Sequence, residues 1–187
     1  MTELISFAAG GTIALVWTQR KARRWSKLIR VSGEAVKAGA IEQAESALKA
    51  ALAVADSSRG PLWFGRRVAT LLPLAQLLVN RGRYEEAAEV TVEFVEAVRR
   101  RAVDSDLIAR GLCLLGDIAA ARGSLAEAES LYRSTLEMEE RMLGPQNIDL
   151  APTLVKLASV LQSQMRRGEA AVLFNRCSDI ISAQSPP

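Results

Sequence analysis

The side chains that most often perform catalysis or bind metals are scarce in this chain. It contains no histidine, which removes the commonest general base and the commonest metal ligand. The two cysteines, Cys113 and Cys177, are far apart in the sequence and belong to no C-x-x-C metal pair. We expect both to be buried thiols in helices, although the spacing leaves a disulfide between them open.

No enzyme motif is present either. The sequence lacks G-x-x-x-x-G-K, G-x-G-x-x-G and G-x-S-x-G, and its one Gly-Gly pair, Gly10-Gly11, lies in apolar surroundings. Paired carboxylates occur only where polar helix faces are expected. The sequence therefore predicts a protein that is not an enzyme and needs no metal or cofactor. The alternative is an all-helical enzyme or regulator whose site is built across several elements.

The charge is distributed unevenly. Residues 1–30 hold six basic groups against Glu3, a net charge of +5, whereas the rest of the chain carries a net charge of −2. The basic pI therefore comes from one local cluster, and we do not expect the body of the protein to bind nucleic acid.

The N-terminal segment suggests a membrane anchor. Residues 4–17 carry no charge and would form about 21 Å of helix, against about 30 Å for a hydrocarbon core. The predicted anchor side chains are Leu4, Ile5, Phe7, Ile13, Leu15, Val16 and Trp17, and the basic membrane flank is Arg20, Lys21, Arg23 and Arg24. Positive charges after the apolar run favour a signal anchor with the rest of the chain on the cytoplasmic side. A cleaved signal, or a soluble chain whose first helix is buried or lies at an interface, remains open.

A short turn sequence recurs four times along the chain. The copies are G-A-I-E-Q-A, G-R-Y-E-E-A, G-S-L-A-E-A and M-R-R-G-E-A, and they end at Ala44, Ala87, Ala128 and Ala170. Successive alanines are separated by a nearly constant interval of about 42 residues, and a constant period of this size is typical of a stacked repeat array.

Each turn joins two amphipathic helices. Ahead of the fourth turn, for example, Leu154, Leu157, Ala158 and Leu161 form one apolar stripe of period 3.6. We predict an all-α fold of antiparallel helix-turn-helix units over about 25–57, 66–103, 107–143 and 150–182. These units would form a repeat domain over 25–182, after an anchor and basic flank at 1–24 and before a disordered tail at 183–187. Gly33 weakens the first unit, because it interrupts the first helix.

The pattern resembles the tetratricopeptide repeat. An apolar-x-x-Leu-small segment, then G-x-apolar-x-x-Ala, then an aromatic residue four positions later is clearest in the third and fourth units. The long period, with Leu143-Gly144-Pro145 and Asp149, is similar to the long-helix subtype of kinesin light chains. The resemblance implies a right-handed α-solenoid whose first helices line a concave face that binds a protein or peptide partner.

On that resemblance, the partner-binding groove would be formed by residues offset from the packing stripes. They are Ala69, Leu72, Gln76, Arg110, Cys113, Asp117, Val155, Ser159 and Gln162. The lysine and asparagine ladder of the family's carboxylate clamp is absent from these positions. The run from Leu154 to Ala158 also lacks the asparagine pair of kinesin light chains. The ligand class therefore stays open.

The last helix has no polar cap after it in this sequence. A repeat array normally ends on a polar capping helix. We therefore expect an exposed edge at Leu173, Cys177, Ile180 and Ile181 that contacts a partner or a second copy.

Together these features predict an interaction scaffold tethered to a membrane, with its repeats on the cytoplasmic side. A bacterial inner membrane fits best, and a mitochondrial outer membrane is the alternative. A soluble or complex-embedded subunit of a larger secretion, pilus or import assembly also fits, with the N-terminal helix as a docking element.

Overall fold

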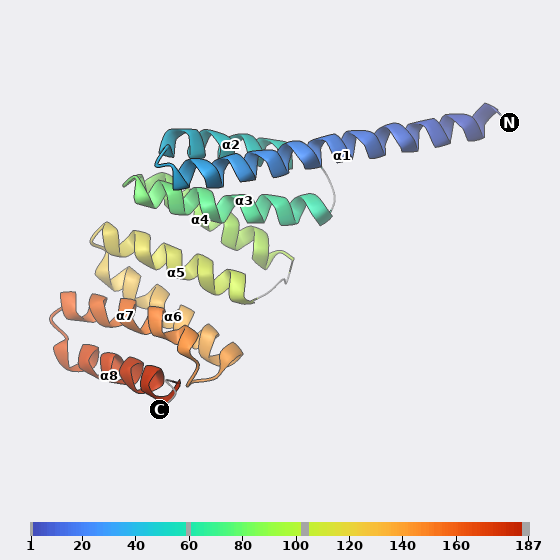
Figure 1. Cartoon of the computed structure of the whole chain (residues 1–187). Helices are drawn as coiled ribbons and strands as arrows, with labels where there is room; N and C mark the ends of the chain where they lie inside the picture. The colour runs from blue at the N-terminus through green and yellow to red at the C-terminus, as the bar shows by residue number, and fades with distance from the viewer. Residues whose placement is uncertain (1, 59–60, 102–104, 185–187) are drawn as a thin grey trace. The chain divides into compact units, whose positions relative to one another are not determined.

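The computed structural model consists of helices and short turns in the residues that it describes. These are the backbone of residues 2–58, 61–101 and 105–184, with the side chains of residues 18–58, 62–101 and 106–183. The α-helices of these segments are α1 (Thr2–Lys37), α2 (Ile41–Asp56), α3 (Pro61–Asn80), α4 (Tyr84–Arg99), α5 (Ser105–Ala121), α6 (Leu125–Leu143), α7 (Ala151–Ser163) and α8 (Arg167–Gln184) (Figure 1). A short 3₁₀ helix, η1 (Ile148–Leu150), precedes α7. The prediction of an all-α fold is confirmed.

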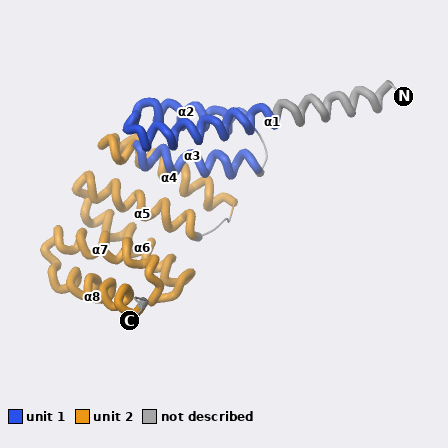
Figure 2. The backbone as a smooth tube through the Cα atoms, viewed as in Figure 1, with its two compact units in different colours: residues 1–77 blue, residues 78–187 orange. Residues whose placement is uncertain are grey.

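The helices divide into two compact units, residues 1–77 and 78–187 (Figure 2). In sequence they form four pairs spanning 2–56, 61–99, 105–143 and 151–184, against the expected units at 25–57, 66–103, 107–143 and 150–182. The backbone of α1 runs unbroken through Gly33, so the expected interruption there is wrong. An isolated glycine within a long helix costs only about 1 kcal/mol. α8 reaches Gln184, which makes residues 183 and 184 helical; residues 185–187 lie outside the described part.

All four repeated turns have the same backbone conformation. Gly39, Gly82 and Gly123 have φ of 72°, 71° and 78°, and Met165 has φ of 64° at the corresponding position of the fourth turn. At the third turn, the N–H of Gly123 donates to the carbonyl of Ala120 and that of Ser124 to the carbonyl of Ala119. The other three turns repeat both hydrogen bonds. This left-handed helix ending favours glycine, which has no steric penalty at positive φ.

Unit 2 has a core built from the predicted stripes. Leu154, Leu157, Ala158 and Leu161 of α7 are buried with Tyr132 of α6. On α5, Gly116 allows the Tyr132 ring to lie against the helix backbone, because a β-carbon at residue 116 would lie 2.6 Å from Tyr132 Cε1. Residue 116 is thus glycine where the close approach of the ring requires it.

Unit 1 is held by tryptophan contacts between its helices. Trp63 is buried with Val54 and Ala55, and Trp25 of α1 packs against this cluster. The Trp25 Nε1–H donates to Thr70 Oγ1 at 3.0 Å, which links α1 to α3. The Arg66 guanidinium lies 4.3 Å from the Trp63 ring centroid and 5.6 Å from that of Trp25.

Candidate partner-binding site on helices α5 and α7

One face of α5 and one face of α7, both in unit 2, form the candidate site. On α5, Arg110, Cys113 and Asp117 follow one another at intervals of three and four residues and lie on one face. Arg110 is exposed, while Cys113 and Asp117 are half-buried. On α7, the predicted groove residues Val155, Ser159 and Gln162 are spaced by four and three residues, and all three are exposed. The two faces therefore supply accessible or partly accessible surface within one unit.

A lysine of α7 connects the two faces. Lys156 Nζ donates to Asp117 Oδ2 at 2.8 Å and to Cys113 Sγ at 3.3 Å. The Tyr132 hydroxyl, from α6, donates to the other carboxylate oxygen of Asp117 at 2.7 Å. Asp117 therefore accepts from two helices, and we call Cys113, Asp117, Tyr132 and Lys156 the polar cluster.

The Cys113 thiol, the Tyr132 phenol and the Lys156 ammonium group keep their protons at neutral pH. Burial raises the pKa of the Cys113 thiol, and burial together with the Asp117 hydrogen bond raises the pKa of the Tyr132 phenol. Desolvation lowers the pKa of Lys156, but hydrogen bonding to Asp117 outweighs it and the pKa lies above its ordinary value. The cluster thus combines a neutral thiol and a neutral phenol with a lysine cation. It positions helices and contains no activated nucleophile.

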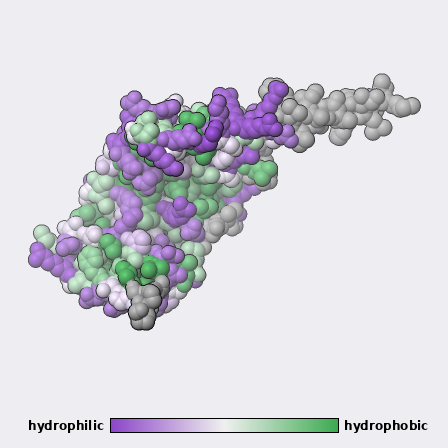
Figure 3. Space-filling model, viewed as in Figure 1, coloured by the Kyte–Doolittle hydropathy of each residue, from purple (hydrophilic) through white to green (hydrophobic). Residues whose placement is uncertain are grey.

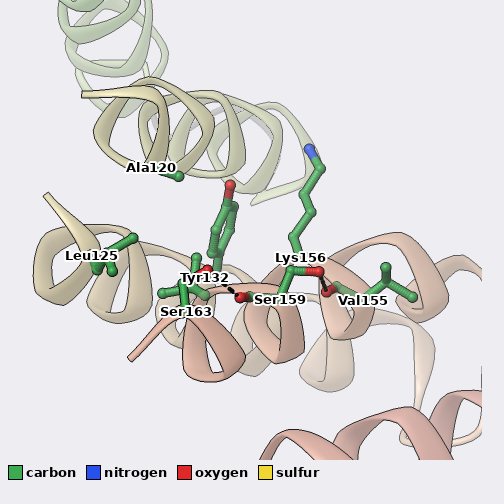
Figure 4. Close-up of a pocket in the computed structure, with 8 residues that line it drawn as sticks. Ala120, Leu125, Tyr132, Val155, Lys156, Ser159 and Ser163 are labelled. Atoms are coloured by element: carbon green, nitrogen blue, oxygen red, sulfur yellow. Dashed lines mark hydrogen bonds between the residues drawn. The ribbon is translucent and has the colours of Figure 1, made fainter. Parts of the chain in front are cut away.

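A hollow of about 260 Å³ lies beside this cluster. Its wall consists of Ala120, Leu125, Tyr132, Val155, Lys156, Ser159, Val160 and Ser163 (Figure 4). Figure 4 shows Tyr132 and Lys156 extending from their own helices toward α5. The wall is mainly apolar and comes from three helices, so the hollow can accept one apolar side chain of a partner.

Two serine hydroxyls of this wall are turned onto their own helix. Ser159 Oγ donates to the carbonyl of Val155 at 2.8 Å, and Ser163 Oγ donates to the carbonyl of Ser159 at 2.9 Å. Each hydroxyl oxygen keeps lone pairs that can accept a further hydrogen bond. The α7 side of the hollow therefore offers acceptors to a bound chain's N–H groups.

The structure brings some predicted groove residues together and leaves others apart. Val155 and Ser159 line the hollow, and Cys113 and Asp117 belong to the polar cluster beside it. The three predicted residues of α3 all lie within unit 1: Ala69 and Gln76 are exposed and Leu72 is half-buried. A groove that continues from them to α5 stays a prediction.

The sequence pattern does not identify Lys156 or Tyr132 as site residues. Lys156 lies in the run from Leu154 to Ala158, and Tyr132 is the aromatic residue that follows the third turn. One signal was available: Asp117 is the only charged residue from Gly111 to Ala121, and it must find a donor if it is partly buried. The sequence alone does not show which donor reaches it.

The predicted edge on α8 is wrong in two of its four positions. Cys177 and Ile180 are buried in the core of unit 2, and Leu173 is partly buried against it. These three side chains lie on the inner face of α8, because residues three, four and seven apart share a helix face. Ile181, by contrast, is exposed.

The N-terminal predictions are only partly covered by the structure. Arg20, Arg23 and Arg24 are exposed, and Lys21 Nζ donates to the carbonyl of Ser57 at 2.8 Å. The side chains of Leu4, Ile5, Phe7, Ile13, Leu15, Val16 and Trp17 lie outside the described residues. Within the described part of the chain, no helix combines the length and apolar character needed to cross a membrane.

Comparison with known proteins identifies a family for the second half of the repeat region. Residues 107–183 match the tetratricopeptide repeat model. The third and fourth helix pairs are tetratricopeptide repeats. The match covers the third and fourth helix pairs, where the sequence resembles the tetratricopeptide repeat most clearly. Among curated proteins, no sequence matches this chain.

Solved structures share the fold of this chain. BtubC (BKLC) from P. vanneervenii has a TM-score of 0.79 at 23% identity, over 93% of this chain and 68% of that chain. Nearly identical TPR-like repeats, assigned to a kinesin light chain of Podosopora anserina, give a TM-score of 0.71 at 19% identity, over 87% and 77% of the two chains. The Rap conjugation gene regulator of plasmid pLS20, in complex with the Phr* peptide, gives 0.70 at 15% identity, over 86% and 42%. This chain therefore spans less than half the length of that Rap regulator.

Proposed function

We propose that this protein is a non-enzymatic scaffold that binds a peptide segment of a partner protein on the face formed by α5 and α7. The observation that carries the proposal is the hollow between α5, α6 and α7. Its apolar wall accepts a side chain, and Ser159 and Ser163 accept hydrogen bonds from the peptide backbone. The Rap regulator with its bound Phr* peptide supports the same mode of action in a similar fold.

The polar cluster fixes the helices of this site in position before a partner binds. The ion pair between Lys156 and Asp117 joins α7 to α5, and the Tyr132 hydroxyl joins α6 to the same carboxylate. Because the helices are held in place before binding, less conformational entropy is lost when a peptide binds. The partner's contribution is one apolar side chain together with main-chain N–H donors.

A peptide selection with matched variants tests the proposal. Random peptides displayed on phage are selected on the full chain, and the affinity of the selected peptides is measured for Val155→Glu and Val92→Glu. The two valines are matched in exposure, 40% for Val155 and 43% for Val92, but only Val155 lines the hollow. We expect Val155→Glu to weaken binding about tenfold or more and Val92→Glu to leave it within about twofold. Equal affinity for both variants would refute the proposal.

We also propose that the segment before the repeats attaches the scaffold to the cytoplasmic face of a membrane. Support comes from the uncharged run at 4–17 and the exposed Arg20, Arg23 and Arg24 that follow it. Basic groups next to an apolar run attract anionic headgroups by about 1 kcal/mol each. Fractionation of cells expressing the full chain, or a chain without residues 1–17, tests this. Recovery of the full chain in the soluble fraction without detergent would overturn it.

A further inference from the structure

Helix α8 carries an exposed stripe of apolar and small side chains that shares only Ile181 with the edge expected from the sequence. Ala171, Phe174, Ser178 and Ile181 of α8 follow one another at intervals of three, four and three residues, which is the spacing of one helix seam. Phe174 and Ile181 are 36% and 44% exposed. We call these four residues the terminal seam. Figure 3 shows apolar surface at the C-terminal end of the chain.

In the preceding helix pairs, the two inner positions of this register are buried. One repeat earlier, the positions of Phe174 and Ser178 are occupied by Tyr132 and Leu136 of α6, which are buried in one cluster with α7 residues. Tyr132 also lies against Gly116 of its own helix pair. The positions of Ala171 and Ile181 are occupied by Glu129 and Glu139, which are half-buried. Two repeats earlier, the position of Ser178 is occupied by Val95 of α4, whose Cγ2 lies against Gly111 of α5. The terminal seam is therefore a surface of the kind that packs against another helix in this fold.

The first helix of a second copy is a poor occupant for this surface. The buried positions Gly111 and Ile118 of α5 correspond, two repeats earlier, to Lys27 and Glu34 of α1, and both of these are exposed. Figure 3 shows hydrophilic surface over α1 and α2. Head-to-tail stacking would bury these two charges against the side chains of the seam. This burial is unfavourable, because none of the four seam residues carries a charge that could pair with them.

The seam is complementary to itself. In an antiparallel pair of α8 helices with a two-fold axis at residue 176, Ala171 and Ile181 are each five residues from the axis, and Phe174 and Ser178 are each two. A large side chain of one copy then meets a small side chain of the other at all four positions, as close helix packing requires. The flanking positions 175 and 182 hold asparagine and serine, so no like charges meet beside the seam.

We propose that the terminal seam binds the same seam of a second copy of this chain, with the two α8 helices antiparallel. From Ala171 to Ile181 the seam spans about 15 Å of helix, which is short for a dimer interface. The contact is therefore smaller than the roughly 800 Å² per partner of a standard interface, and we expect a dissociation constant on the order of 10 µM.

Sedimentation of the full chain over a concentration series measures this dimer. Ile181→Arg should weaken dimerisation at least about tenfold, because it buries a charge on both copies. Val172→Arg is the matched control: Val172 is 66% exposed on the same helix but lies off the seam, and its variant should dimerise like the wild type. A wild-type chain that stays monomeric, or an equal effect of both variants, overturns the proposal.

A pair of complementary variants then tests the antiparallel arrangement. Phe174→Glu and Ser178→Lys should each remain monomeric alone, because a dimer of either variant would bury two unpaired charges. Their mixture should form a heterodimer, in which the introduced carboxylate of one chain meets the introduced ammonium group of the other. Failure of the mixture to associate, while wild type does, would contradict the antiparallel seam.

Discussion

The fourth turn offers a test of how the repeats are connected. Met165 has φ of 64° where the other three turns have glycine, and it makes the same two hydrogen bonds as they do. Its side chain is 76% exposed and contributes little packing. Met165→Gly should therefore relieve backbone strain at this turn without removing an important contact.

The expected gain follows from two opposing effects. A residue with a β-carbon is destabilised by about 1–2 kcal/mol in the left-handed region. Glycine removes this cost, but it also makes the unfolded chain more flexible, which reduces the gain in stability by roughly 0.5–1 kcal/mol. We expect Met165→Gly to raise the free energy of unfolding by about 0.5–1 kcal/mol. In a chain of this size, that raises the melting temperature by about 1–4 °C.

Urea and thermal unfolding followed by circular dichroism measure the change. Gly123→Ala is the converse variant, because Gly123 has φ of 78° and a β-carbon there meets no neighbouring atom. It should lower stability by about 1 kcal/mol through backbone strain alone. If Met165→Gly destabilises the protein, or Gly123→Ala does not, the explanation of the four turns by left-handed strain is wrong.

Two other predictions concern packing and pH. Gly116→Ala should lower the free energy of unfolding by about 1–3 kcal/mol, because its β-carbon would lie 2.6 Å from a Tyr132 ring carbon. A β-carbon at residue 33 has no such neighbour, so Gly33→Ala should stabilise α1 by about 0.5–1 kcal/mol. Urea unfolding of both variants measures these changes. Burial raises the pKa of Glu139, so the folded protein keeps a proton that the unfolded chain loses, and stability falls as pH rises above the ordinary glutamic acid range. Glu139→Gln should remove this part of the pH dependence and raise stability at neutral pH; an unchanged profile of unfolding free energy against pH would contradict it.

The fold could be predicted because its signals are local and repeated. Glycine at three of the turns and a stripe such as Leu154 to Leu161 each specify helix ends and faces within a few residues. Met165 could also be aligned, since Ala170 five residues later keeps the spacing. These features need no knowledge of what lies across the core.

The site could be predicted only in part, because its key contacts join distant residues. Lys156 and Asp117 are 39 residues apart, and the sequence does not show that they meet. The prediction of an exposed edge on α8 is wrong for another reason. Apolar residues lie on both faces of α8, so the sequence does not show which face is buried. Ile180 and Ile181 are neighbours in sequence, yet only Ile180 belongs to the core.

The most direct test of the proposed function is to observe where a selected peptide binds. Methyl-labelled full-length protein is titrated with a peptide from the phage selection, and the NMR shifts of its valine and leucine methyl groups are followed. We predict that Val155, Val160 and Leu125, which line the hollow, shift on binding while Val92 does not. Shifts confined to Val92 or to other methyl groups outside the hollow would contradict binding on the face of α5 and α7.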